Sequence, residues 1–237
     1  MLLLMVSKIS TEPSLATQLN SFIKLMERNY KDVWVGADVG ACIGIITHKY
    51  AEIMKHVYSF EPDPHNYKLL KSNFNEVKNV TTVNLAVCDE INELDFLTKS
   101  PSLQFDDNGT FINHPWWGIH RCGLNKEFIN LKEWDDCSEF YSIKVPSTTL
   151  DEYFKDIFVD FIKIDVEGAE WDVFKGAQKL LEERDIIYQV EFHNERDWHK
   201  RKFLYDREYD IYDLDFNKLD RVYGEMPYHG YISKEEL

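Results

Sequence analysis

The chain has 237 residues and a formal net charge of −15, so it is long enough to bury one full hydrophobic core and is strongly acidic. The negative charge disfavours nucleic acid, whose phosphates are bound mainly by Lys and Arg, and it disfavours anionic membrane surfaces. The apolar start, residues 1–6, is too short to span a bilayer. The sequence therefore predicts one domain, 1–237, without a nucleic-acid or membrane partner.

Cysteine usage indicates the compartment. No C-x-x-C pair occurs, which argues against a zinc site and fits a reduced, cytoplasmic environment. The four cysteines are Cys42, Cys88, Cys122 and Cys137. A disulfide between the last two stays open as an alternative.

The first elements are a helix and a strand with a glycine turn. Residues 14–29 carry apolar side chains at helical spacing and predict a helix. An apolar strand then runs into a turn with Gly40 and Gly44, before a helix from about Ile45. Such a turn lets a backbone approach a ligand, and the helix start offers free N–H groups. Tight packing of strand against helix explains the same pattern, and the spacing is not the dinucleotide-binding G-x-G-x-x-G.

A second strand, Val57–Phe60, ends in Glu61, and a helix is predicted over 65–73. Glu61 lies about 20 residues after the glycine turn, where an acid is suited to accept both hydroxyls of a ribose. The alternative is a carboxylate that only stabilises its turn. Residues 80–87 alternate and predict a third strand, and residues 91–97 predict a further short one.

From Lys99 to Val145 the periodic pattern is lost, and so long a loop in a compact domain is usually functional or disordered. Its aromatic residues argue against disorder. Paired tryptophans with nearby polar side chains suit a sugar-like or other flat polar acceptor, so this insertion, 99–145, is predicted to be an acceptor-binding cap. The residues concerned are His114, Trp116, Trp117, His120 and Arg121. The alternative is that the tryptophans anchor the insertion onto the core.

The most informative stretch follows a short helix, for which Ser147 or Thr148 is the predicted cap. An apolar strand, Phe161–Ile164, ends in Asp165, and an amphipathic helix runs to Leu181. In open α/β sheets ligands bind at the carboxyl ends of strands, which places Asp165 at a binding site. Alternatively, Asp165 caps the helix that follows it.

The last predicted strands complete an α/β fold. Residues 186–194 form a strand with a polar end, and residues 209–214 and 221–223 are two candidate closing strands within the tail, 195–237. With the N-terminal helical segment, 1–30, the order of elements predicts a mostly parallel sheet with helices on both faces.

Five motifs occur in order between about residues 33 and 194. They are Asp38–Gly44 (Asp-Val-Gly-Ala-Cys-Ile-Gly), Phe60–Pro64, Thr149–Asp151, Ile162–Glu170 (Ile-Lys-Ile-Asp-Val-Glu-Gly-Ala-Glu) and Val190–His193. In these motifs the chain resembles the FkbM type of class I S-adenosylmethionine-dependent methyltransferases. The Ile162–Glu170 run is the specific one, and Cys42 departs from the family, which usually has Asn there.

The resemblance implies a Rossmann-like, seven-stranded sheet and O-methylation of a hydroxyl, often on a sugar or polyketide-like scaffold. It assigns the methionine part of the cofactor to Asp38, Gly40, Ala41 and Gly44. It assigns the ribose to Glu61, with Pro62 beside it. Ala86 to Asp89 would flank the adenine. Asp165 is placed in the same cofactor site, and Glu191 is placed with the acceptor.

A sugar hydroxyl is a poor nucleophile unless a base removes its proton. His193 and Asp165 are the candidate bases, and His193 is preferred because its ordinary pKa lies near neutral pH. A purely structural strand-end histidine is the alternative. A divalent cation is an open alternative, because Asp165, Glu191, His193 and Asn194 offer mostly oxygen ligands of the kind that magnesium prefers; no ligand spacing demands a metal, so none is assigned.

Three other functions share parts of this pattern. An NAD-dependent oxidoreductase would share the strand-end acid but not the glycine spacing. A nucleic-acid methyltransferase would share the cofactor fold, but the net charge and the lack of an Asp/Asn-Pro-Pro-aromatic tetrapeptide speak against it. A non-catalytic binding module on the same fold is the main alternative from another class.

Overall fold

The computed structural model describes residues 13–28, 34–99, 140–192, 198–221 and 227–237. Its main element is a seven-stranded sheet with the strand order β3-β2-β1-β7-β8-β10-β9. The strands are β1 (Val35–Val39), β2 (His56–Phe60), β3 (Val80–Val83), β7 (Phe161–Ile164), β8 (Ile187–Glu191), β9 (Asp210–Tyr212) and β10 (His229–Ser233). Only β10 runs antiparallel to its neighbours in this sheet, so the predicted mostly parallel, seven-stranded α/β fold is confirmed.

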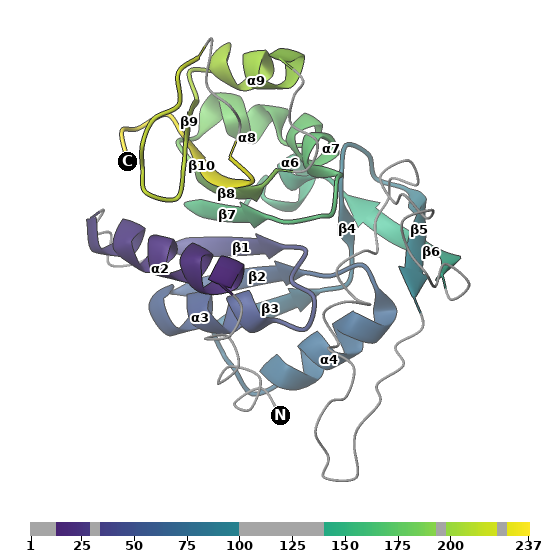
Figure 1. Ribbon diagram of the computed structural model, residues 1–237. Helices are drawn as coiled ribbons and strands as arrows, with labels where there is room; N and C mark the ends of the chain where they lie inside the picture. Colours follow the sequence, from purple (N-terminus) through teal and green to yellow (C-terminus); the bar gives the residue numbers. More distant parts are fainter. Residues whose placement is uncertain (1–12, 29–33, 100–139, 193–197, 222–226) are drawn as a thin grey trace.

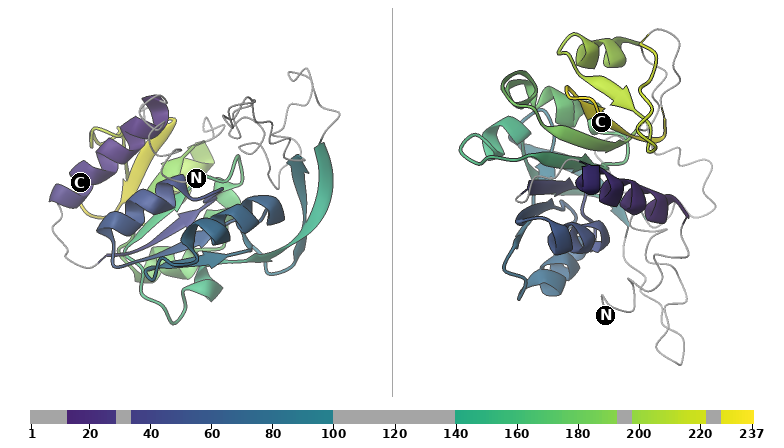
Figure 2. Two further views of the ribbon diagram at one scale, coloured as in Figure 1. Left: turned by 90° about the horizontal axis from the view of Figure 1, so that it is seen from below. Right: turned by 90° about the vertical axis from the view of Figure 1, so that its left-hand side faces the viewer.

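Helices cover both faces of this sheet, as predicted (Figure 2). On one face α2 and α3 share a hydrophobic cluster that includes Phe22, Tyr50 and Phe161. On the other face α6, α7 and α8 pack against the strands in a second cluster, which includes Phe174 and Leu181. The helices are α2 (Pro13–Arg28), α3 (Ile45–Ile53), α4 (Pro64–Phe74), α6 (Leu150–Tyr153), α7 (Glu170–Lys175), α8 (Gln178–Glu183) and α9 (Trp198–Tyr205).

A second, three-stranded sheet stands beyond the carboxyl ends of β1 and β2 (Figure 1). It has the order β4-β6-β5 and consists of β4 (Ala86–Val87), β5 (Glu93–Lys99) and β6 (Phe140–Thr148). Two predictions were therefore wrong in detail. The expected strand over 80–87 is broken after Val83, because Ala86 and Val87 pair with β6 instead. Residues 140–145, assigned to an irregular insertion, form the first two thirds of β6.

Two helices also differ from the sequence prediction. The cap of α6 is Thr149, whose Oγ1 accepts the N–H of Glu152 at 3.1 Å, whereas Ser147 lies within β6. The expected helix to Leu181 is divided into α7 and α8 near Gly176. A Cβ at Gly176 would lie 2.0 Å from the carbonyl oxygen of Cys88, so the chain passes too close there for any side chain.

The tail also differs from its prediction. The first closing strand is confirmed as β9, but the second is β10, and Arg221 lies in a turn. The tail contains helix α9 as well. None of the helices in the described parts of the chain is long and apolar enough to cross a membrane.

Candidate active site

The turn after β1 is packed directly against the end of β7. Gly40 has a left-handed backbone with φ +84°, and a Cβ there would lie 1.8 Å from the carbonyl oxygen of Asp165. Gly44 has φ +93°, and its Cβ would lie 2.3 Å from the ring of Phe74 in α4. Both positions therefore need glycine for packing within the protein, which was the alternative interpretation. The assignment of Gly40, Gly44 and the buried Ala41 to the cofactor stays a prediction.

Cys42 lies in the same turn and also has a left-handed backbone, with φ +52°. Side chains with a Cβ rarely adopt this conformation, and Asn tolerates it better than most. This gives a physical reason for the Asn that is usual in the resembled family. The backbone N–H of Cys42 donates to Glu61 Oε2 at 2.9 Å, so the turn is tied to the end of β2.

Glu61 is 5% exposed and accepts two backbone hydrogen bonds. Its Oε2 receives the N–H of Cys42, and its Oε1 receives the N–H of Asp63 at 2.9 Å. Burial raises the pKa of Glu61 to about 8, against the opposing effect of these hydrogen bonds. The side chain of Asn66 donates a third hydrogen bond to this carboxylate, so of the four hydrogen bonds that its two oxygens can accept, one stays available for a ribose hydroxyl.

Asn84 directly follows β3 and was not predicted as part of the site. Its side-chain amide donates to the carbonyl oxygens of Glu61 and Pro62 at 2.7 and 3.1 Å. Ala86, proposed beside the adenine, is buried in the small sheet in a cluster with Phe96. Asp89 is exposed beyond β4. The earlier end of β3 could have been found from Asn84, because an amide in an otherwise apolar strand pattern often marks a turn.

An ion-paired lysine lies in the middle of the sheet. Lys163 is 3% exposed, and its Nζ lies 3.0 Å from Asp165 Oδ2 and 3.4 Å from Asp38 Oδ1. Burial alone would lower the pKa of Lys163, but the carboxylates of Asp165 and Asp38 outweigh it and raise the pKa. Asp38 is fully buried, and its Oδ2 accepts the hydroxyl of Thr47 at 2.6 Å.

Lys163 belongs to a row of polar side chains that crosses the whole sheet in register. Residues paired across neighbouring strands point to the same face, so the row lies under α2 and α3. Its members are Thr82, Ser59, Asp38, Lys163, Gln189, Tyr231 and Tyr212. Hydrogen bonds join the row to its covering helices, for instance from the Tyr50 hydroxyl to Gln189 Oε1 at 2.7 Å.

The alternative interpretation, in which Asp165 caps the following helix, is wrong. The residue before α7 is Ala169, and the Gly168 N–H is accepted by Glu170 Oε1 at 2.9 Å. Asp165 instead turns back to Lys163 at the carboxyl end of β7. An ammonium at this distance stabilises the charged carboxylate and fixes its direction.

The end of β8 brings further polar groups to the same edge. Glu191 is its last residue and is paired in register with His229 of β10. Of the other residues predicted for the acceptor or for catalysis, His193 lies outside the described residues. So do His114, Trp116, Trp117, His120 and Arg121. Within the described ranges, no group of His, Cys, Asp and Glu side chains is arranged to hold a metal ion.

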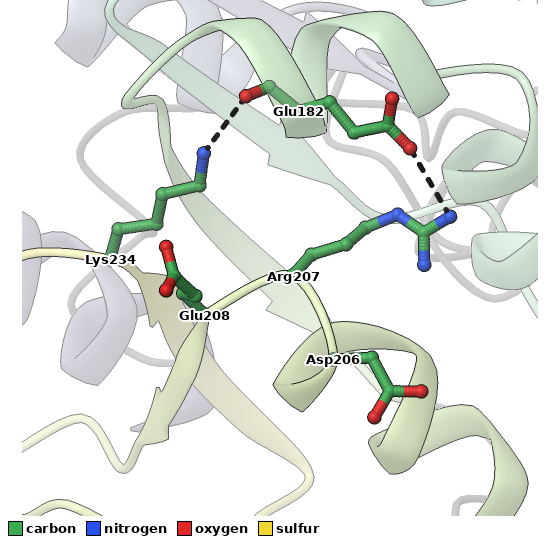
Figure 3. A pocket seen from close by; sticks show the side chains of 5 residues that line it. All are labelled: Glu182, Asp206, Arg207, Glu208 and Lys234. Atoms are coloured by element: carbon green, nitrogen blue, oxygen red, sulfur yellow. Dashed lines mark hydrogen bonds and ion pairs between the residues drawn. The ribbon is translucent and has the colours of Figure 1, made fainter.

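A hollow of about 420 Å³ lies elsewhere, near the end of β10 opposite to His229 (Figure 3). Both of its cationic side chains have acidic partners within the protein: Arg207 lies 3.6 Å from the carboxylate of Glu182, and Lys234 lies 3.6 Å from that of Asp185. It is far from the edge where Gly40 meets Asp165, so we do not assign it to the active site.

The seven-stranded sheet has the strand order of the class I methyltransferase fold, in which an antiparallel strand, here β10, is inserted between β8 and β9. The methyltransferase FkbM domain matches residues 38–233. The chain therefore belongs to the FkbM methyltransferase family, and its methyl donor is S-adenosylmethionine.

Solved structures give more distant likenesses. The methyltransferase FkbM from Methylobacillus flagellatus KT is 16% identical, with a TM-score of 0.48; the match covers 85% of this chain but 44% of that one. A SAM-dependent methyltransferase from Aquifex aeolicus is 11% identical, with 96% of each chain covered and a TM-score of 0.43. No curated protein matches the chain. Neither structural likeness identifies the acceptor.

Proposed function

We propose that the protein transfers a methyl group to a hydroxyl of a small molecule or glycan, with a sugar hydroxyl as the first choice. The observation that carries the proposal is the position of two carboxylates, Asp165 and Glu191, on adjacent strand ends beside the Gly40 turn. Carboxylates accept hydrogen bonds from hydroxyls, and a net charge of −15 suits a neutral polyol better than a nucleic acid.

The residues of the carboxyl edge fit the cofactor. Glu61 has capacity for a ribose hydroxyl, and the start of α3, which has no side-chain cap, offers backbone N–H groups to the methionine part. Asp165, held by Lys163, supplies a negative charge of fixed direction near a cationic ligand. When bound, the cofactor supplies a methyl group that is already activated on a sulfonium.

The protein itself must align the acceptor oxygen with the methyl group and provide a base for the acceptor's proton. Asp165 is ill suited to take up that proton, because protonation would break its ion pair with Lys163 at 3.0 Å. This argument favours Asp165 as an orienting group for the cofactor. His193 stays a candidate base, and the insertion with Trp116 and Trp117 stays a candidate acceptor cap.

The test is methyl transfer from radiolabelled S-adenosylmethionine to methyl glycosides, a phenol, an amine and a transfer RNA. We expect a methyl ether on a glycoside, identified by NMR. Transfer only to the amine or the RNA would refute O-methylation of a sugar. Cofactor binding without any transfer would favour the non-catalytic binding module.

Cofactor titrations give an independent check on the site. Glu61→Ala should abolish binding of S-adenosylmethionine, measured by isothermal titration, and Glu183→Gln on the exposed end of α8 serves as the control. Unchanged affinity of Glu61→Ala would remove Glu61 from the ribose role.

A further inference from the structure

The antiparallel strand β10 brings two further residues, Tyr228 and His229, to the edge of the sheet where β1, β2, β7 and β8 end. Neither residue belongs to a motif of the sequence. The parallel strands end at this edge, whereas β10 begins there, so its first residue, His229, lies beside Glu191, the last residue of β8. Tyr228 immediately precedes β10, and its carbonyl accepts the N–H of Phe192 at 2.7 Å. The end of β8 and the start of β10 are thus held together by backbone pairing.

The side chains of this pair approach each other. His229 Nδ1 lies 3.8 Å from Glu191 Oε2, and the two side chains are 11% and 15% exposed. On the opposite side of the ring, His229 Nε2 lies 3.4 Å from the amide nitrogen of Gln18 in α2. An amide nitrogen can only donate, so this contact leaves the ring N–H on Nδ1, facing Glu191.

Tyr228 adds a second donor to the same carboxylate. Burial raises the pKa of Tyr228, and so do its hydrogen bond to Glu191 and the nearby negative charges of Glu191, Glu167 and Asp165. The hydroxyl is therefore protonated at neutral pH and donates to Glu191. Tyr228 is 57% exposed, so its side chain lies at the solvent-accessible side of this end of the sheet.

The two carboxylates of the edge have different surroundings. Asp165 is fixed by the ammonium of Lys163, which opposes protonation. Glu191 lies beside the hydroxyl of Tyr228 and the imidazole of His229, and neither of these neutral groups carries a permanent positive charge that opposes protonation of Glu191. A base must change its charge during the reaction, so the second environment suits that role better.

We propose that Glu191 is the catalytic base of the methyl transfer and that His229, fixed by Gln18, is its positioning residue. The inference rests on the proposed function, because only a hydroxyl acceptor needs a base of this kind. The acceptor O–H bond breaks and its proton passes to Glu191. The oxygen electron pair forms the bond to the methyl carbon, and the pair of the broken C–S bond stays on sulfur.

The first test compares Glu191→Gln with the wild type and with Glu183→Gln as a matched carboxylate-to-amide control away from the edge. We expect Glu191→Gln to lower the turnover number by on the order of 10²–10⁴ while S-adenosylmethionine affinity stays within about twofold. His229→Gln should lower turnover by about tenfold and shift the acidic limb of the pH–rate profile. If Glu191→Gln turns over at the wild-type rate, Glu191 is not the base.

The second test needs no acceptor. The imidazole of His229 is followed by NMR against pH in the free protein, with the resonance assigned from its loss in His229→Gln. We expect a higher titration midpoint in the wild type than in Glu191→Gln, because the carboxylate stabilises the imidazolium. Charged or titrating groups that also face the pair are Lys163, Asp165, Glu167 and Tyr228.

The two tests separate the possible failures. Absence of transfer by the wild type to every acceptor would refute the proposed function and with it the base role of Glu191. Transfer by the wild type that is lost in His193→Ala but kept in Glu191→Gln would move the base role to His193. Equal titration midpoints for His229 with and without the Glu191 carboxylate would overturn the positioning role.

Discussion

The stability of the protein should depend on pH through Glu61. The carboxyl group is buried, which raises its pKa from an ordinary value of 4.5 to about 8. The folded state therefore binds this proton more tightly than the unfolded chain, and the stability it contributes is present below pH 4.5 and lost as the pH rises through about 8.

The size of the effect follows from the interval between the two pKa values. One pKa unit corresponds to about 1.4 kcal/mol, so the interval from 4.5 to about 8 corresponds to at most about 5 kcal/mol. Between pH 5.5 and 8, where other carboxyl groups titrate little, the expected loss is about 3 kcal/mol.

The measurement is urea unfolding of the wild type and of Glu61→Gln at several pH values in that range. The amide cannot ionise, so the free energy of unfolding of the variant should gain about 3 kcal/mol relative to the wild type by pH 8. The variant also loses an acceptor for one of two backbone N–H groups, but this loss does not depend on pH. A difference between the two proteins that stays constant over the range would refute the buried, protonated Glu61.

Three further predictions concern the same edge. Binding of S-adenosylmethionine at pH 7 should release about one proton, since ribose hydroxyls favour ionised Glu61; calorimetry in two buffers of different ionisation enthalpy measures it. Lys163→Met should destabilise the fold by about 3–5 kcal/mol, because it leaves the Asp38 carboxylate buried and unpaired, whereas exposed Lys179→Met should change stability by less than about 0.5 kcal/mol. Cys42→Asn should stabilise the fold by about 0.5–1 kcal/mol through its left-handed backbone, and a decrease in stability would contradict this reason.

The parts of the fold that could be predicted are those with a strong local pattern. The strand Phe161–Ile164 is uniformly apolar apart from one lysine, and Glu61 directly follows an apolar run, so both strand ends were placed correctly. β10 was missed because its sequence, His-Gly-Tyr-Ile-Ser, alternates poorly. Gly230 is needed there because a Cβ would lie 2.4 Å from the carbonyl oxygen of Tyr212. That contact joins segments that no local pattern relates.

The candidate site was predicted only in part, for a related reason. Asp165 was placed at the edge of the sheet because it follows an apolar strand, and Glu191 was assigned to the acceptor through the family resemblance; the roles of both residues stay predictions. Lys163 carried a signal that was not used: a lysine within a buried strand requires a partner, and Asp38 stands at the equivalent position of another apolar strand. No pattern in the sequence around His229 marked it as a site residue. It reaches Glu191 only because β10 runs antiparallel to β8, which a local pattern does not predict.

The row of polar side chains explains why these residues act together. Lys163 forms ion pairs with Asp165 at the edge of the sheet and with Asp38 inside the sheet. The orientation of the Asp165 carboxylate is therefore fixed by residues that lie inside the sheet. The carboxylate of Glu191, on the adjacent strand, is oriented instead by His229 and Tyr228. A carboxylate fixed by a permanent cation keeps its charge, whereas one fixed by neutral donors can take up a proton. Two acidic residues on adjacent strand ends can therefore serve different roles: orienting the cofactor and accepting the proton.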